Sequence, residues 1–197
     1  EKPYLEYKGS KHNVNQHSKL VRRIFNEGTF NRGGRFYGGW WQHISEKQRE
    51  MILMDDRAII EIDYKSLHPI LAYANKGIDF WKTVNVTKYS YFNDSYDVPT
   101  NGLKDKKDSR TVVKLLFLTA INAKNEKECF KTFRDQWDYK DHPYTGLFSD
   151  TFLKELLDSI RDRHYQIDDM FCSGVGIDLQ KWDSDIVEYI VSDFTER

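Results

Sequence analysis

The stretch AIIEIDYKSLHPILAYA at 58–74 constrains the fold of this chain more than any other part of its sequence. Its β-branched residues predict a strand over 57–63, and the apolar run after the Ser-Leu-His-Pro turn predicts a helix over 65–75. Side chains alternate along a strand, so Glu61 and Asp63 would point the same way. Carboxylates at the exit of a buried strand can hold a divalent metal beside a phosphate, whereas an isolated aspartate there often caps the next helix.

Composition limits the class of protein. The 197 residues suffice for one substantial domain or two small lobes, and the net charge of −1 means that any positive charge for nucleic acid must be local. Two scattered cysteines, Cys129 and Cys172, predict neither a disulfide scaffold nor a zinc cluster, and favour a reducing, intracellular (cytoplasmic) location. No apolar run approaches about 18 residues, so we expect no membrane span. The chain begins at Glu1 without a signal peptide or methionine, which suggests a piece of a longer protein.

The remaining pattern predicts a mostly helical α+β fold with a small antiparallel sheet. We expect a short basic helix over 15–26, an extended or hairpin segment over 28–44, and a helical turn over 45–51 that is capped by Ser45. A turn-rich surface excursion is expected over 84–102. Further helices are expected over 103–123, 125–137, 150–167 and 177–195.

The segment 103–123 begins basic and ends apolar. Arg110 and Lys114 are four residues apart, so they share a face of the helix. Two cations on one face, with no acid between them, can clasp a triphosphate, although charge clusters are commonly just solvated helix ends. The apolar continuation LLFLTAINA anchors this helix in a core, which favours binding.

The run DYKSLHP, from Asp63, resembles the first palm motif of polymerases. It is similar to the Asp-Tyr-Ser motif of family A DNA polymerases and to the Asp-x-x-Ser-Leu-Tyr-Pro motif of family B. The resemblance implies that Asp63 is the catalytic ligand of Mg²⁺ or Mn²⁺. His68 takes the sixth position, where a bulky residue excludes the ribose 2′-hydroxyl and so implies deoxynucleotides. The alternative is a half-buried histidine held by a backbone carbonyl.

The run RTVVK resembles the fingers helix of the same superfamily, and most closely the Arg-x-Val-x-Lys of phage-type single-subunit RNA polymerases, whose following threonine is matched by Thr119. The resemblance implies that Arg110 and Lys114 bind the incoming nucleoside triphosphate. The Tyr-Gly pair of these enzymes falls on Asn122 and Ala123. Asn122 would then lie at the nucleotide's sugar and base, but it cannot stack as the tyrosine does.

Two further segments resemble elements that grip the primer–template in family A enzymes. RGGR, ending at Arg35, and the following WQHI, which contains Gln42, are similar to a Gly-Arg element and an Asn-x-Gln-x-Ile-Pro segment. LQKWDSDIV at 179–187 is similar to the Gln-x-x-x-Ala-Asp-Ile-Ile helix. Arg35, Gln42 and Gln180 are thereby implied to bind nucleic acid. The alternatives are a tight aromatic hairpin and an ordinary amphipathic helix.

The second palm motif, a His-Asp pair, would follow the last helix by one strand, and no matching pair precedes Arg197. Asp168-Asp169 follows a helix, and Asp141-His142 has the reverse order, so we interpret both as surface residues. A two-metal site therefore cannot close within this chain. We expect a fragment, a chain completed by the missing palm segment on another chain, or an inactive protein.

The resemblance divides the chain into an N-terminal arm and palm part at 1–75, a fingers-like lobe at 76–176 and a truncated palm helix at 177–197. It implies a fragment of a template-dependent nucleotidyltransferase, most simply a DNA polymerase of DNA replication that extends a primer with dNTPs by a two-metal mechanism. Three alternatives stay open: a relative of single-subunit RNA polymerases, a non-catalytic nucleic-acid-binding module, and a helical interaction domain with fortuitous motifs.

Overall fold

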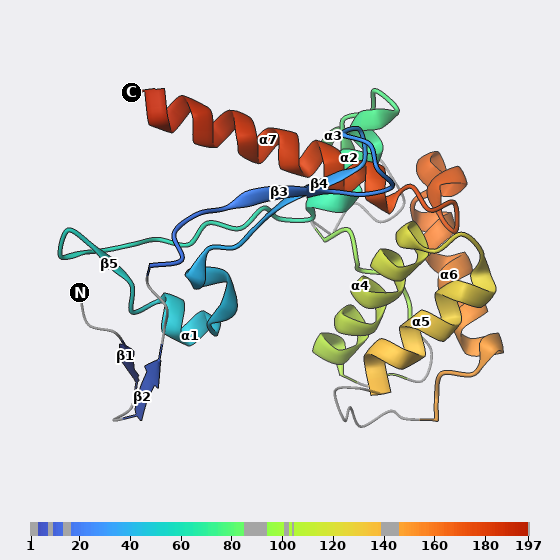
Figure 1. Cartoon of the computed structure of the whole chain (residues 1–197). Helices are drawn as coiled ribbons and strands as arrows, with labels where there is room; N and C mark the ends of the chain where they lie inside the picture. The colour runs from blue at the N-terminus through green and yellow to red at the C-terminus, as the bar shows by residue number, and fades with distance from the viewer. Residues whose placement is uncertain are drawn as a thin grey trace. The chain divides into compact units, whose positions relative to one another are not determined.

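The computed structural model describes residues 4–7, 10–13, 17–84, 94–100, 103, 105–138 and 146–196. They belong to two compact units: the first comprises Glu1–Lys65 and Ser184–Arg197, and the second comprises Ser66–Asp183. The chain is mostly helical with small two-stranded antiparallel sheets, so the expected α+β class is confirmed (Figure 1). Within the described part, no helix combines the length and apolar character needed to cross a bilayer.

Among its described residues, the first unit contains three antiparallel hairpins, each made of neighbouring strands. Its elements are β1 (Tyr4–Tyr7), β2 (Ser10–Asn13), β3 (Arg22–Phe25), β4 (Gly33–Tyr37), the 3-10 helix η1 (Trp40–His43), α1 (Glu46–Arg49), β5 (Leu53–Met54) and β6 (Arg57–Ala58). The hairpin of β3 and β4 confirms that 28–44 contains an extended segment. The helical turn after Ser45 is also confirmed, because Gln48 Oε1 accepts from the Ser45 backbone N–H and hydroxyl, both at 2.9 Å.

The second unit is helical. Its elements are α2 (Leu67–Asn75), α3 (Phe80–Val84), α4 (Lys106–Asn122), α5 (Glu126–Asp138), α6 (Asp150–Arg163), the 3-10 helix η2 (Tyr165–Met170) and the beginning of α7 (Gly176–Glu196), whose later residues belong to the first unit. The helices that the sequence predicts in this unit are present, with ends shifted by a few residues. The helix α4 packs against both α5 and α6 (Figure 1).

Sequence explains where α4 starts and which side it buries. Asp105 caps the helix, because its carboxylate accepts from the backbone N–H groups of Lys107 at 2.7 Å and Asp108 at 3.1 Å. The residues that face the core recur at helical spacing and are fully enclosed. They are Val112, Val113, Leu116, Phe117, Ala120 and Ile121.

A buried histidine lies among the aromatic side chains of this core. The ring of His164 is 5.3 Å from that of Phe117, 5.8 Å from that of Tyr73 and 6.3 Å from that of Phe80, and only 1% of the residue is exposed. Its Nε2 donates to the carbonyl oxygen of Ser95 at 2.8 Å. A carbonyl only accepts, so Nδ1 is unprotonated and accepts from the Tyr73 hydroxyl at 3.1 Å.

Two sequence expectations are wrong. The basic stretch 15–26 is not a helix: its later part is β3, paired with β4, and burial alternates along it as in a strand. The strand expected over 57–63 is reduced to Arg57–Ala58, and residues 59–64 lie outside any helix or strand. Ile60 and Ile62 are each 85% exposed, because β propensity forms a strand only where a neighbouring strand and a covered face support it.

The units also end at other positions than the expected domains. The contacts divide the chain after Lys65 and after Asp183, where the sequence interpretation placed boundaries after 75 and 176. The first difference arises because α2 packs on α3 and η2 and so belongs to the helical unit.

Stability of the second unit should depend on pH through His164. Burial, with a smaller effect of Arg163, lowers the pKa of His164 from 6.5 to about 4, so the folded chain resists the proton that the unfolded chain accepts. The contribution of neutral His164 to the free energy of unfolding is complete above pH 6.5. It is lost as the pH falls toward 4, and the total loss is about 3 kcal/mol. Urea unfolding between pH 4 and 7 would measure it. His164→Gln should flatten the profile, whereas the exposed-site control His43→Gln should not; equal slopes in both would contradict the assignment.

Candidate functional site

The helix α4 presents two predicted phosphate ligands to solvent. Arg110 and Lys114 are both exposed and lie one turn apart, while Val112, Val113 and Leu116 are buried on the opposite side. The sequence prediction of a cationic face on a core-anchored helix is therefore confirmed. Lys114 is the more accessible donor for a ligand, because Arg110 is engaged within the chain.

Arg110 forms an ion pair with Asp94. Its Nε donates to Asp94 Oδ2, its Nη2 lies 3.3 Å from Asp94 Oδ1, and its guanidinium carbon lies 5.4 Å from the centre of the Tyr96 ring. The hydrogen bond with Asp94 raises the pKa of Arg110, and burial raises the pKa of Tyr96 to about 12. A phosphate that binds Arg110 must compete with this carboxylate.

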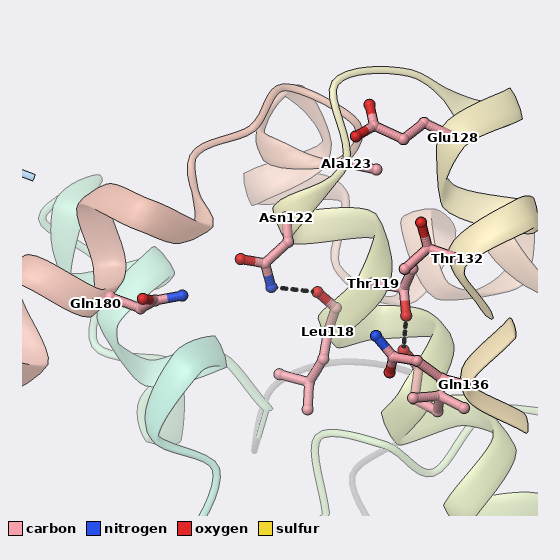
Figure 2. Close-up of a pocket in the computed structure, with 9 residues that line it drawn as sticks. Leu118, Thr119, Asn122, Ala123, Glu128, Thr132, Gln136 and Gln180 are labelled. Atoms are coloured by element: carbon pink, nitrogen blue, oxygen red, sulfur yellow. Dashed lines mark hydrogen bonds between the residues drawn. The ribbon is translucent and has the colours of Figure 1, made fainter. Parts of the chain in front are cut away.

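A polar cavity of about 330 Å³ lies at the other end of α4, between α4, α5 and the start of α7 (Figure 2). Its wall is rich in amide and hydroxyl side chains, with one acid. The lining residues are Leu115, Leu118, Thr119, Asn122, Ala123, Glu128, Thr132, Gln136 and Gln180. The structure thus brings together Asn122 and Gln180, two site residues that the sequence predicts from separate motifs.

The cavity suits an uncharged polar group better than an anion. Asn122 Nδ2 donates to the Leu118 carbonyl at 2.7 Å, and the amides of Asn122 and Gln180 point toward one another (Figure 2). Glu128 Oε2 accepts from the backbone N–H of Lys124 at 3.0 Å. Amides offer donors and acceptors together, as the edges of bases and sugar hydroxyls require, whereas the Glu128 carboxylate repels phosphate.

Asp63, the predicted metal ligand, is an exposed residue of the first unit. Glu61 is engaged by Arg49, whose Nε lies 3.0 Å from each carboxylate oxygen. Among the residues that the structure describes, no three acidic, histidine or cysteine side chains group to hold a metal. A metal held by Asp63 would therefore take most of its ligands from other molecules, as Mg²⁺ commonly does from phosphate oxygens and water.

The other predicted residues lie as follows. His68 is half-buried in the first turn of α2, and Arg35 is half-buried in β4, opposite Ile24. Gln42 serves the hairpin itself: its Oε1 accepts from Gly38 N–H and its Nε2 donates to the Phe36 carbonyl, both at 2.9 Å. This supports the alternative of a tight aromatic hairpin for Gln42.

Sequence reasoning missed Arg23, the most engaged side chain of this hairpin. Arg23 donates to the Gly34 carbonyl at 2.8 Å, and pairs with Asp185 at 2.8 Å and with Glu188 at 2.5 Å. Its guanidinium lies over the Phe25 ring at 4.9 Å. The only signal in the sequence is the position of Arg23 two residues before Phe25, since its acidic partners lie more than 160 residues later.

The glycines of the RGGR element have an internal explanation. Gly34 has a φ of +85°, and a β-carbon there would lie 2.7 Å from Arg23 Nη2 and 2.8 Å from Phe25 Cε1. The absence of a side chain at Gly34 therefore makes room for the chain's own Arg23 and Phe25.

A second cavity, of about 690 Å³, belongs to the first unit. Its lining includes Trp40, Trp41, Ile59 and the Arg49–Glu61 pair. The cavity lies beside the WQHI segment, but Gln42 is not among its lining residues.

Comparisons with known proteins add no family to this description. No protein-family model, no curated protein and no solved structure matches the chain.

Gly176, the first residue of α7, lies against Asn122, which lines the polar cavity. A β-carbon at Gly176 would lie 2.2 Å from Asn122 Oδ1 and 2.6 Å from its Cγ. Gly176→Ala should displace the Asn122 side chain, break its hydrogen bond to Leu118 and cost about 1 kcal/mol of unfolding free energy, measured in urea. In an Asn122→Ala background the same substitution should cost much less. An unchanged cost in that background would contradict the contact.

Proposed function

We propose that this chain is part of a template-dependent nucleotidyltransferase, a DNA polymerase of family A type that binds dNTPs and a primer–template. The observation that supports it most is the arrangement on α4: Arg110 and Lys114 are exposed on a helix whose opposite side is buried. A pair of cations on a rigid helix suits a triphosphate, because its oxygens accept charge-assisted hydrogen bonds.

The polar cavity supplies the other half of the proposed substrate site. Asn122 lies two turns beyond Lys114 on α4, about 12 Å along the axis, a span that one extended nucleoside triphosphate can bridge. Phosphates would lie against Lys114 and Arg110. The uncharged sugar or base would lie toward Asn122 and Gln180, whose amides suit it.

Asp63 is proposed to ligate Mg²⁺ together with the triphosphate oxygens. When bound, the metal would neutralise phosphate charge and activate the primer hydroxyl. In this proposal His68 contacts the sugar and excludes a 2′-hydroxyl, and Arg35 contacts the primer–template. Gln42, which the sequence also assigned to the primer–template, uses its amide within the hairpin instead.

One observation favours a second candidate, the non-catalytic nucleic-acid-binding module. Arg110 is already paired with Asp94, so its charge is partly satisfied without a nucleotide. Such a module would bind nucleic acid through phosphate charge alone, with strong dependence on salt and none on a metal.

Titration of the chain with a fluorescent dNTP in Mg²⁺ tests the proposed triphosphate site. Lys114→Ala should weaken nucleotide binding about tenfold, the size of one lost charge-assisted contact. It should affect primer–template binding far less. The matched control is Lys131→Ala, which removes an equally exposed lysine from α5 and should leave nucleotide binding unchanged. Equal loss in both variants, or equal loss of nucleotide and template, would refute the assignment of Lys114.

The same titration separates the two candidates. In the polymerase proposal, chelation of Mg²⁺ and Asp63→Ala should each abolish nucleotide binding. Binding of nucleic acid that falls steeply with salt, yet ignores both the metal and Asp63, would favour the module instead.

Asp94 offers an opposite test, in which a substitution strengthens binding. Asp94→Asn removes the negative charge that competes for Arg110. The Oδ1 of an asparagine can still accept the hydrogen bond that Tyr96 N–H donates to Asp94 Oδ1 at 3.1 Å. Triphosphate affinity should therefore rise several-fold, and Arg110→Ala should cancel the gain. Weaker binding by Asp94→Asn would show that Arg110 acts through its ion pair rather than through phosphate.

A further inference from the structure

The cavity of about 690 Å³ in the first unit has no role in the proposed chemistry, yet its volume lies in the usual range of small-molecule sites, about 300–1,000 Å³. Its apolar walls come from η1 and from the β5–β6 hairpin with its flanking residues. They consist of Trp40, Trp41, Ile52, Leu53, Met54 and Ile59. Leu53 is 60% exposed and Met54 is 68% exposed, so these side chains meet water unless a ligand covers them.

Two tryptophans give this cavity a flat surface. The ring centroids of Trp40 and Trp41 lie 6.1 Å apart, and the rings are nearly perpendicular, at 82°. A planar ligand can therefore stack on one indole and meet the other edge to face. A β-carbon at Gly39 would lie 2.4 Å from Trp41 Cζ2, 2.5 Å from Cε2 and 2.7 Å from Cη2, so the backbone of Gly39 lies against one face of the six-membered ring. The opposite face is the one on which a ligand can stack.

The charged groups of the lining limit which part of a ligand can enter. Arg49 and Glu61 pair at 3.0 Å, and Lys19 and Asp55 add one charge of each sign. The lining is therefore neutral in sum, which favours an uncharged inserted group over a phosphate. Within the described ranges, Asp55 has no hydrogen-bond or ion-pair partner, so its carboxylate can accept from an N–H group of the ligand.

An exposed cation lies next to the cavity. Arg57 is the cross-strand partner of Met54 in the β5–β6 hairpin, and residues opposite each other on a hairpin project from the same face. In the part of the chain that the structure describes, the Arg57 guanidinium also has no partner. A group that enters beside Met54 can thus carry a phosphate that reaches Arg57.

We propose that this cavity binds an unpaired base of single-stranded nucleic acid, with a preference for a base that carries an exocyclic amino group. The base stacks on Trp41, its amino group donates to Asp55, and its phosphate contacts Arg57. Cytosine fits, because an aspartate accepts from its N4 amino group. Only the choice of nucleic acid as the ligand rests on the proposed function, in which the strand is the template beyond the primer. The site uses none of the residues of the triphosphate site on α4.

The unaltered chain tests the proposal without any substitution. Fluorescence anisotropy would measure the binding of a labelled oligodeoxycytidylate, an oligothymidylate and an abasic strand of the same length, without Mg²⁺ or dNTP. Affinity should be about tenfold lower for the abasic strand, the size of one lost stacking contact. Affinity for the oligothymidylate should be lower several-fold, because thymine has no exocyclic amino group. Equal affinity for the oligodeoxycytidylate and the abasic strand would overturn the proposal.

Matched substitutions assign the contacts. Trp41→Ala should remove the difference in affinity between the oligodeoxycytidylate and the abasic strand, and Trp41→Phe should keep most of it. The control Trp81→Ala removes a partly exposed tryptophan of the second unit and should leave the difference unchanged. Asp55→Ala should remove the preference for cytosine over thymine. Persistence of the difference in Trp41→Ala, or its loss in Trp81→Ala, would overturn the proposal.

Two further variants separate stacking from phosphate charge. Arg57→Gln should weaken the binding of all three strands equally and lower the salt dependence of log K by about 0.7. Gly39 has a φ of −65°, which alanine also adopts, so Gly39→Ala should act by displacing the Trp41 ring and should reduce base-dependent binding as Trp41→Ala does.

The same measurements distinguish this site from the proposed function. Base-dependent strand binding by a chain that binds no dNTP would refute the polymerase proposal and support this site. Binding of dNTP that depends on Lys114, without base-dependent strand binding, would support the polymerase proposal and overturn this site.

Discussion

Burial of one side of α4 determines how the second unit presents its polar groups. Because Val112, Leu116 and Phe117 must face the core, Lys114 must face solvent and Asn122 must reach the end of the helix beside α7. Phe117 also connects α4 to the aromatic cluster of the core, because its ring contacts that of His164. Burial of the apolar side chains thus determines where the polar side chains of α4 lie. Exposing the buried side of α4 to water would cost more free energy than new contacts of its charged residues could supply.

The helices were predictable from sequence because their periodicity is local. In α4 and α7, apolar residues recur every three or four positions over many turns. The region 59–64 was misjudged because a strand depends on neighbours that propensity does not contain: Ile60 and Ile62 are β-branched yet exposed. The stretch 15–26 was misjudged for the same reason, because the pairing of its later part, β3, with β4 decides its conformation.

The candidate site was predictable residue by residue but not as an arrangement. Motif positions indicated Asn122 and Gln180 separately, yet their convergence on one cavity depends on the packing of α4 and α7. Arg23 was missed because its partners are distant in sequence.

The ion pairs of Arg23 with Asp185 and Glu188 have a consequence for the order in which the protein is made. The second unit is continuous in sequence, so a ribosome delivers all of its residues before it reaches Ser184. The first unit is discontinuous in sequence. Arg23 is translated early, whereas its partners Asp185 and Glu188 are translated only after the second unit. The helical unit can thus fold during synthesis, while the hairpin receives its counter-charges last.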